Sequence, residues 1–170
     1  YRVSASLRPR GGEHLCGDQV DHFEVGDEVS LLLCDGMGSG PGAGRESSLA
    51  VRLLEQFLMA GVETGHALAT LNSALALRGE EEGGFTTVDL LQVDLFTGEG
   101  AVYKLGAAPT YVRRGSSVRR IAGSSLPAGP FGARGARPSP AAAGGGGLRP
   151  YGQRRHRRNW GRRLGPGAAG

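Results

Sequence analysis

Acidic residues stop at Glu99 in this 170-residue chain, and Lys104 is its only lysine. Residues 1–129 hold 11 basic and 16 acidic residues, a net charge of −5. Residues 130–170 hold nine Arg and no acid, a net charge of +9. The overall charge of +4 and the isoelectric point near 9.6 therefore describe neither part, and they are no evidence for nucleic-acid binding by residues 1–129.

Long hydrophobic runs are also absent. No segment approaches the ~18 apolar residues of a transmembrane helix, and the first residues do not have the charged and apolar regions of a signal peptide. Two cysteines cannot form a disulfide framework, which is typical of a reducing compartment. We therefore expect a cytoplasmic location, with any membrane anchor in a region outside this chain. The first residue is Tyr1 rather than Met, which indicates a fragment of a longer protein.

Residues 130–170 lack the apolar residues of a core. Gly, Ala, Pro and Arg make up 32 of these 41 residues, and such a composition cannot bury enough apolar surface to offset the ordering entropy. We therefore predict a folded domain over 1–129 and a disordered tail over 130–170. The abrupt change near Gly129 also suggests out-of-frame translation of a GC-rich gene, which the coding DNA would test. A basic run at 154–158 beside Trp160 leaves nucleic-acid binding open, although we expect none.

The hydrophobic pattern predicts strands, then a pair of helices, then further strands. Runs bounded by Gly predict the strands, and leucines at spacings of three and four predict the helices. Gly61 is expected as the C-cap of the first helix, Thr64 as the N-cap of the second and Gly79 as its stop. This order favours an α+β fold with antiparallel strands over βαβ units. The expected strands cover residues 1–7, 20–25, 29–34, 85–95, 101–105, 110–113 and 118–121, with a Gly-rich loop over 35–44 and helices within 45–78.

The two strands joined by Gly26 and Asp27 give the sharpest geometric prediction. Gly at the first central position suits a type II′ turn, and a two-residue turn at this place brings Asp18 opposite Asp35. Directly opposed residues have Cβ atoms roughly 4.5–5.5 Å apart. Two facing carboxylates repel each other unless one is protonated or a cation lies between them, and oxygen ligands favour Mg²⁺ or Mn²⁺. The spacing alone does not exclude the alternative, which is that both are ordinary aspartates that flank turns.

The histidine and cysteines near Asp18 and Asp35, and a third aspartate, are further candidates for chemistry. His14 beside Cys16 fits no zinc-ligand spacing and is expected in a solvated loop. Cys16 and Cys34 are expected to act as small hydrophobic residues near the acid pair. Asp89 is interpreted mainly as a structural residue, with a contribution to the site left open.

Several motifs resemble the SpoIIE-type branch of the metal-dependent protein phosphatases, the PPM family. The most specific part is Cys16-Gly17-Asp18 followed by Cys34-Asp35-Gly36-Met37-Gly38-Ser39-Gly40. The resemblance continues through Arg45-Glu46-Ser47, Asn72-Ser73, Leu77-Arg78, Phe85-Thr86-Thr87-Val88-Asp89, Lys104-Leu105-Gly106-Ala107-Ala108-Pro109 and Ser125-Leu126-Pro127-Ala128-Gly129. It covers about residues 1–129.

The resemblance implies the PPM fold, an antiparallel β-sandwich flanked by helices, and hydrolysis of phosphoserine or phosphothreonine with two Mn²⁺ or Mg²⁺ ions. Carried over by motif, Asp18 and Asp35 would be catalytic metal ligands, with Asp35 bridging both ions and the Gly36 carbonyl binding one. The helix pair over about 45–78 would switch activity by positioning the Gly loop. The implied substrate is a phosphorylated regulatory protein such as an anti-anti-sigma factor, in the control of a sigma factor during sporulation.

One departure from the family pattern concerns the end of the chain. The family continues after the Ser-Leu-Pro-Ala-Gly motif with further strands, a second Asp-Gly motif and a final metal-binding Asp. This chain has no acidic residue after Glu99, so we expect a fold that is incomplete at the C-terminus. The resemblance therefore leaves enzymatic activity open, and the alternative is a non-catalytic PPM-like module that binds its partner without hydrolysis.

Overall fold

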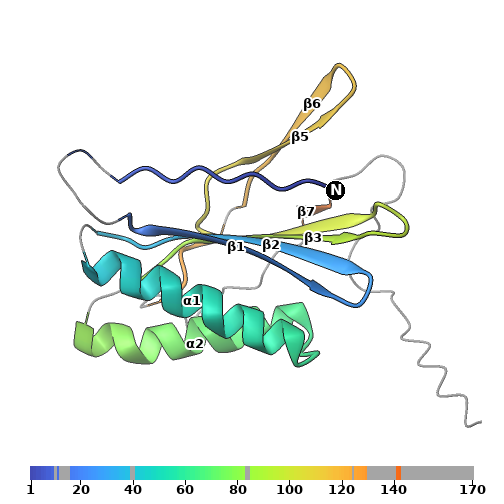
Figure 1. Ribbon diagram of the computed structural model, residues 1–170. Helices are drawn as coiled ribbons and strands as arrows, with labels where there is room; N and C mark the ends of the chain where they lie inside the picture. The colour runs from blue at the N-terminus through green and yellow to red at the C-terminus, as the bar shows by residue number, and fades with distance from the viewer. Residues whose placement is uncertain are drawn as a thin grey trace, which may run out of the picture.

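The computed structural model describes residues 1–9, 11, 16–38, 41–82, 85–123, 125–129 and 141–142. The larger sheet is antiparallel, in the order β1 (Asp18–Val25), β2 (Glu28–Asp35), β3 (Val88–Asp94), β4 (Gly100–Leu105) and β7 (Ala141–Ala142). A separate hairpin pairs β5 (Thr110–Arg114) with β6 (Ser117–Ile121). Helices α1 (Pro41–Met59) and α2 (Thr64–Glu82) cover one face of the larger sheet, and the β5–β6 hairpin projects from the other face (Figure 1). The expected α+β architecture with antiparallel strands is confirmed.

The β1–β2 hairpin has the predicted turn and register. Gly26 has a φ of 61°, and Asp27 is not among the residues with a positive φ, so the turn is of type II′. Val25 pairs with Glu28 beside the turn, and the pairing runs without a bulge to Asp18 opposite Asp35. A bulge would have moved the two carboxylates apart. Their opposition therefore follows from a two-residue turn and eight unbroken residue pairs.

Helix α1 ends as predicted and begins earlier than predicted. Gly61 has a φ of 78°, its N–H donates to the Leu58 carbonyl, and the Val62 N–H donates to the Phe57 carbonyl. These are the two hydrogen bonds of a Schellman motif, which confirms the C-cap. The helix starts at Pro41, inside the expected loop, because the fixed φ of proline suits the first turn and its missing N–H costs nothing there.

Helix α2 corrects two predictions about its ends. The Glu63 carboxylate, rather than Thr64, accepts the N–H groups of Gly65 and His66, and the Glu63 carbonyl accepts the first intrahelical bond from Ala67. The Thr64 hydroxyl instead donates to Gln92 on β3. The expected stop at Gly79 is also wrong, since the helix continues to Glu82. One glycine inside a helix costs only about 1 kcal/mol relative to Ala, and three Glu residues with good helix propensity follow it.

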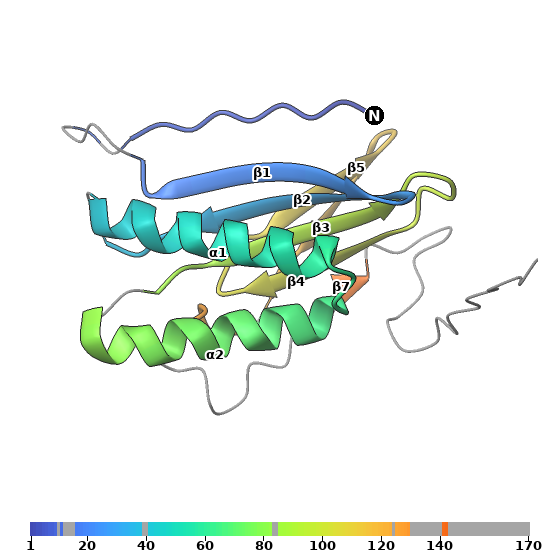
Figure 2. The same ribbon diagram turned by 60° about the horizontal axis from the view of Figure 1, so that its bottom comes forward.

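The core lies between the helices and the larger sheet, and Figure 2 shows the two helices in front of that sheet. It is built from side chains with almost no exposed surface on β2, β3, β4, α1 and α2: Leu32, Cys34, Leu54, Leu68, Leu71, Leu75, Val88, Leu90 and Leu105. This packing fixes which face of each strand turns toward the helices, because successive side chains alternate between the faces.

Residues 1–7 do not form the expected strand. They have no strand partner within the described part of the chain, and their side chains are almost all exposed. The segment runs above the sheet (Figures 1 and 2), and the Tyr1 hydroxyl donates a hydrogen bond to the Glu24 carboxylate. A segment with alternating residues is not stabilised as a strand when neither of its faces is buried against the rest of the protein.

The described residues do not cover the segments to which three remaining expectations refer. The predicted tail lies outside them, apart from Ala141–Ala142, which pair with Ala101 and Val102 of β4. The domain boundary near Gly129 stays a prediction. His14 also lies outside the described residues. No helix in the described ranges is long and apolar enough to cross a membrane.

Candidate metal centre

Asp18 and Asp35 lie at the open end of the β1–β2 hairpin. Asp18 is the first residue of β1, Asp35 is the last residue of β2, and the two are direct partners across the ladder. Cys34, next to Asp35, is fully buried in the core on the helix side. Because side chains alternate along a strand, the Asp18–Asp35 pair belongs to the opposite face of the sheet from α1 and α2.

The two carboxylates interact unfavourably when both are charged. Desolvation of the carboxyl raises the pKa of Asp35, and a side-chain hydrogen bond with Asp18 and the negative charge of Asp18 raise it further. Each of these causes disfavours the charged form of Asp35. A divalent cation beside the pair would reverse this preference, because the ion attracts both carboxylates.

The backbone of Asp35 is held by the segment that leads into β3. The Asp35 carbonyl accepts hydrogen bonds from the Thr87 N–H and from the Thr86 hydroxyl, both at 2.9 Å, and the Asp35 N–H donates to the Thr87 hydroxyl at 3.2 Å. Thr86 is fully buried and exchanges two backbone hydrogen bonds with Ala128. These two threonines, whose role the spacing arguments missed, fix the end of β2 and hence the position from which the Asp35 side chain starts.

The start of β1 is fastened to α1 by Ser47. The Gly17 carbonyl accepts hydrogen bonds from the buried Ser47 hydroxyl at 2.6 Å and from the Gly36 N–H at 3.2 Å. Gly36 is packed so closely on α1 that an added Cβ would lie 2.6 Å from the Ala43 carbonyl carbon. Only glycine fits there without a shift of backbone, since unbonded carbons normally approach to about 3.5–4.0 Å.

These residues fit an oxygen-preferring divalent cation. Asp18 and Asp35 supply carboxylates, and the Gly36 carbonyl oxygen lies near Gly17, 3.2 Å from where a Cβ of Gly17 would be. Mg²⁺ is often held by one or two carboxylates while it keeps several waters. Among the described residues there is no group of three or more His, Cys, Asp or Glu side chains that could hold a metal. The described residues therefore supply two facing carboxylates, which is only part of the ligand set of such an ion.

The other candidate residues have structural contacts. The Lys104 ammonium, almost completely buried, donates to Asp89 and to the Ala108 carbonyl, each at 2.6 Å, and Thr110 donates to the same Asp89 oxygen at 2.7 Å. This network joins β3 and β4 to the start of β5. Its contacts fit the structural interpretation of Asp89.

Neither cysteine is in a disulfide. Burial raises the pKa of the Cys34 thiol to about 12, and the negative charge of Asp89 adds to the effect. Cys34 is therefore an uncharged core residue beside the acid pair, in agreement with the expectation of a small hydrophobic residue. Cys16 is partly exposed, and its thiol lies 3.6 Å from the Arg8 carbonyl oxygen.

Comparisons with known proteins point to one family. A family model described as Stage II sporulation protein E (SpoIIE) matches residues 26–141. Stage II sporulation protein E of Priestia megaterium is 37% identical over 121 residues, which cover 71% of this chain and 20% of that protein. The protein of the same description from Bacillus subtilis strain 168 is 36% identical over 132 residues, which cover 76% of this chain and 16% of that protein. The chain thus spans about a fifth or less of the length of these curated relatives.

Solved structures support the same relationship. The PP2C phosphatase domain of SpoIIE from Bacillus subtilis, solved with a fragment of its regulatory domain, matches with a TM-score of 0.67 and 36% identity, over 76% of this chain and 39% of that chain. RsbX, solved in complex with magnesium, matches with a TM-score of 0.59 over 74% of this chain and 60% of that chain, and at 17% identity the likeness concerns the fold. The predicted fold class is therefore confirmed. From the match over residues 26–141, the relatives at 36–37% identity and the shared fold, it follows that this chain belongs to the SpoIIE family of PP2C-type phosphatase domains.

Proposed function

We propose that residues 1–129 form part of a metal-dependent protein serine/threonine phosphatase, with Asp18, Asp35 and the Gly36 carbonyl as ligands of Mn²⁺ or Mg²⁺. One observation carries the proposal: Asp18 is the direct cross-strand partner of Asp35, in a chain of the SpoIIE family. Two opposed carboxylates are stable together when a proton or a cation compensates their charge. A divalent ion would provide this compensation at neutral pH.

The residues around the acid pair have positioning roles in this proposal. When bound, the ions supply activation of water and neutralise the charge of the phosphoryl group. Asp18 and Asp35 would hold the ions through their carboxylates. Thr86 and Thr87 hold the Asp35 backbone, and Ser47 holds the backbone next to Asp18.

The proposed substrate is a phosphorylated regulatory protein of the anti-anti-sigma type, in the control of a sigma factor. Membership of a family whose curated relatives are described as Stage II sporulation protein E supports a sporulation context. The RsbX structure, which contains magnesium, supports the choice of metal for this fold.

A second candidate function is a PPM-like module that binds its partner without hydrolysis. It is favoured by one observation, the absence of any acidic residue after Glu99. A chain with two carboxylates at its centre supplies only part of the ligand set that the family resemblance implies.

Two measurements separate these functions: Mn²⁺ binding followed by electron paramagnetic resonance, and Mn²⁺-dependent release of phosphate from a phosphoserine protein. The phosphatase proposal expects Asp18→Asn and Asp35→Asn each to weaken Mn²⁺ binding and to abolish turnover. Asp27→Asn is the matched control, since it makes the same change at the other end of the same hairpin, and it should alter neither measurement.

The outcomes are distinct. Turnover by the parent chain that depends on both aspartates identifies an enzyme. Mn²⁺ binding that depends on both aspartates, with turnover only after the remaining part of a SpoIIE-family domain is added, identifies this chain as one part of an enzyme. Mn²⁺ binding that is the same in all three variants would rule out the metal site, and partner binding without any metal effect would favour the binding module.

A further inference from the structure

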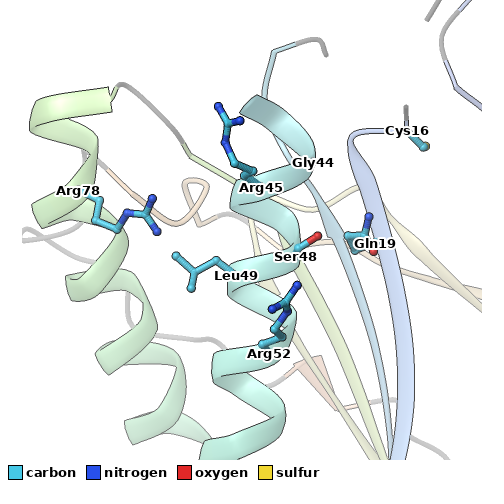
Figure 3. A pocket seen from close by; sticks show the side chains of 8 residues that line it. All are labelled: Cys16, Gln19, Gly44, Arg45, Ser48, Leu49, Arg52 and Arg78. Carbon is cyan, nitrogen blue, oxygen red and sulfur yellow. The ribbon is translucent and has the colours of Figure 1, made fainter. Parts of the chain in front are cut away.

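A basic pocket lies beside the first turns of α1, on the helix side of the sheet. Its volume is about 530 Å³. Figure 3 shows α1 between its neighbours, with Arg78 extending from α2 toward α1 and Gln19 on β1. Its lining includes Gln19, Arg45, Ser48, Leu49, Arg52 and Arg78.

The positive charge of this pocket is compensated only in part, at Arg78. Within the part of the chain that the structure describes, the exposed side chains of Arg45 and Arg52 make no ion pair. Arg78 contacts the Glu46 carboxylate at 3.6 Å. Three arginines around one pocket are a local exception in residues 1–129, whose net charge is −5. The pocket is therefore complementary to an anionic ligand.

The spacing of the arginines favours an extended ligand over a single small anion. Arg45 and Arg52 are seven residues apart on α1, which places them on one side of the helix about 10 Å apart along its axis. One phosphate group is too small to bridge that distance. In an extended peptide, side chains on the same side recur roughly every 7 Å, so two acidic residues of one segment can meet both arginines.

The chemistry of the lining favours a peptide over a nucleic acid. Arg guanidinium groups bind carboxylates through pairs of hydrogen bonds. Ser48 and Gln19 supply polar groups that can bond to a peptide backbone, and Leu49 is the apolar contact. Among the described lining residues no aromatic side chain is present on which a base could stack.

We propose that this pocket docks an extended acidic segment of a partner protein. The pocket and the Asp18–Asp35 pair are on opposite faces of the sheet, with the edge strand β1 between them. Docking at the pocket would therefore take place on the other side of β1 from the acid pair. A partner bound at both places would pass around the β1 edge.

The test is a nuclear magnetic resonance titration of the full 170-residue chain with a ten-residue peptide in which Asp and Gly alternate. Backbone amide signals report each region by itself, so contacts of the peptide with the Arg-rich residues 130–170 do not obscure the pocket. We expect shifts at Gln19 and along Arg45–Arg52, and a dissociation constant for these shifts about tenfold weaker in the R45Q/R52Q variant. The R113Q/R120Q variant removes the same charge from the β5–β6 hairpin and should leave that constant unchanged.

Four results would overturn the proposal. Shifts confined to residues outside the pocket would do so, as would equal affinity of the parent chain and R45Q/R52Q. Equal affinity for a peptide in which Asn replaces Asp would show that carboxylates are not recognised. An oligothymidylate of equal charge that shifts the same amides with equal affinity would overturn the assignment to a protein segment. Because Asp18→Asn and Asp35→Asn lie on the other face, they should leave peptide binding intact, which keeps this test independent of the phosphatase proposal.

Discussion

Gly36→Ala should displace α1 from the end of β2, and the size of the effect follows from the packing. The new Cβ would lie 2.6 Å from the carbonyl carbon of Ala43 and closer still to its oxygen. A normal contact needs about 3.5–4.0 Å, so the two backbone segments must separate by about 1 Å. Gly36 is buried and joined to Gly17 by a hydrogen bond, so the strain cannot be relieved by moving a flexible side chain.

The expected cost is toward the upper end of the range for overpacked sites, about 3 kcal/mol. For a folded part of this size, 1 kcal/mol corresponds to about 3–5 °C in the midpoint of thermal unfolding. The midpoint should therefore fall by about 10 °C. Separation of β2 from α1 also moves the Gly36 carbonyl, so the affinity for Mn²⁺ should fall in the same variant.

Gly42→Ala is the matched control in the first turn of α1. An added Cβ at Gly42 meets nothing within 4 Å, and Ala in a helix is more stable than Gly by about 0.5–1 kcal/mol. This variant should unfold about 2–4 °C higher than the parent chain. Thermal unfolding followed by circular dichroism measures both variants. Equal midpoints for Gly36→Ala and Gly42→Ala would refute the packing argument.

Three further predictions follow from the acid pair, the cysteines and the buried lysine. Because the pKa of Asp35 is raised, the metal-free chain should lose stability as the pH rises from the ordinary pKa of 3.8 through the pKa of the folded state. Asp35→Asn should remove this loss in unfolding curves measured at different pH. The same variant should also lose the stabilisation by Mn²⁺, which is about 2.7 kcal/mol at 100 times the dissociation constant. Cys34, with a pKa of about 12, is a thiolate in only about one molecule in 10⁴ at pH 8. A thiol reagent should therefore modify Cys16 in the folded chain and Cys34 only after unfolding. Equal rates of modification of the two cysteines in the folded chain would contradict the buried position of Cys34. Lys104→Met leaves the Asp89 carboxylate without its ammonium partner and should lower the free energy of unfolding in chemical denaturation by about 3–5 kcal/mol. Adding Asp89→Asn should restore part of that stability. No recovery in the double variant would argue against the ion pair as the cause of the loss.

The sequence predicted the acid pair because the geometry behind it is local. One Gly-Asp turn sets the register of the hairpin, and the register sets which carboxylates meet. The end of α1 was predictable for the same reason, since the left-handed conformation at Gly61 is a local requirement. At the start of α2 the local pattern predicted the wrong N-cap, because Glu63 caps the helix in place of the neighbouring Thr64. The Thr64 hydroxyl instead donates to Gln92 on β3, a contact between distant segments that the local sequence does not signal.

The parts that could not be predicted depend on distant segments. Thr86 lies 51 residues from Asp35, and no periodicity signals a hydroxyl that will bind a strand end so far away. The basic pocket likewise requires α1, α2 and β1 to come together. Its single local sign was the spacing of Arg45 and Arg52, which places them on one side of a helix. The prediction of a strand at residues 1–7 was wrong because alternating apolar and polar residues indicate only that a strand can form. They do not indicate that a neighbouring strand is there to pair with it.

The hydrogen bond from Thr86 to the Asp35 carbonyl has a consequence for the order of folding. Asp18 and Asp35 are 17 residues apart and meet by closing a short loop, whereas Thr86 reaches Asp35 across 51 residues. Loop-closure entropy and contact order both favour the nearer contact first, but an isolated hairpin is only marginally stable. The two carboxylates can thus meet early and separate again until β3 joins β2. A folding experiment in which Mn²⁺ is added at different times should therefore find that firm binding follows the docking of β3.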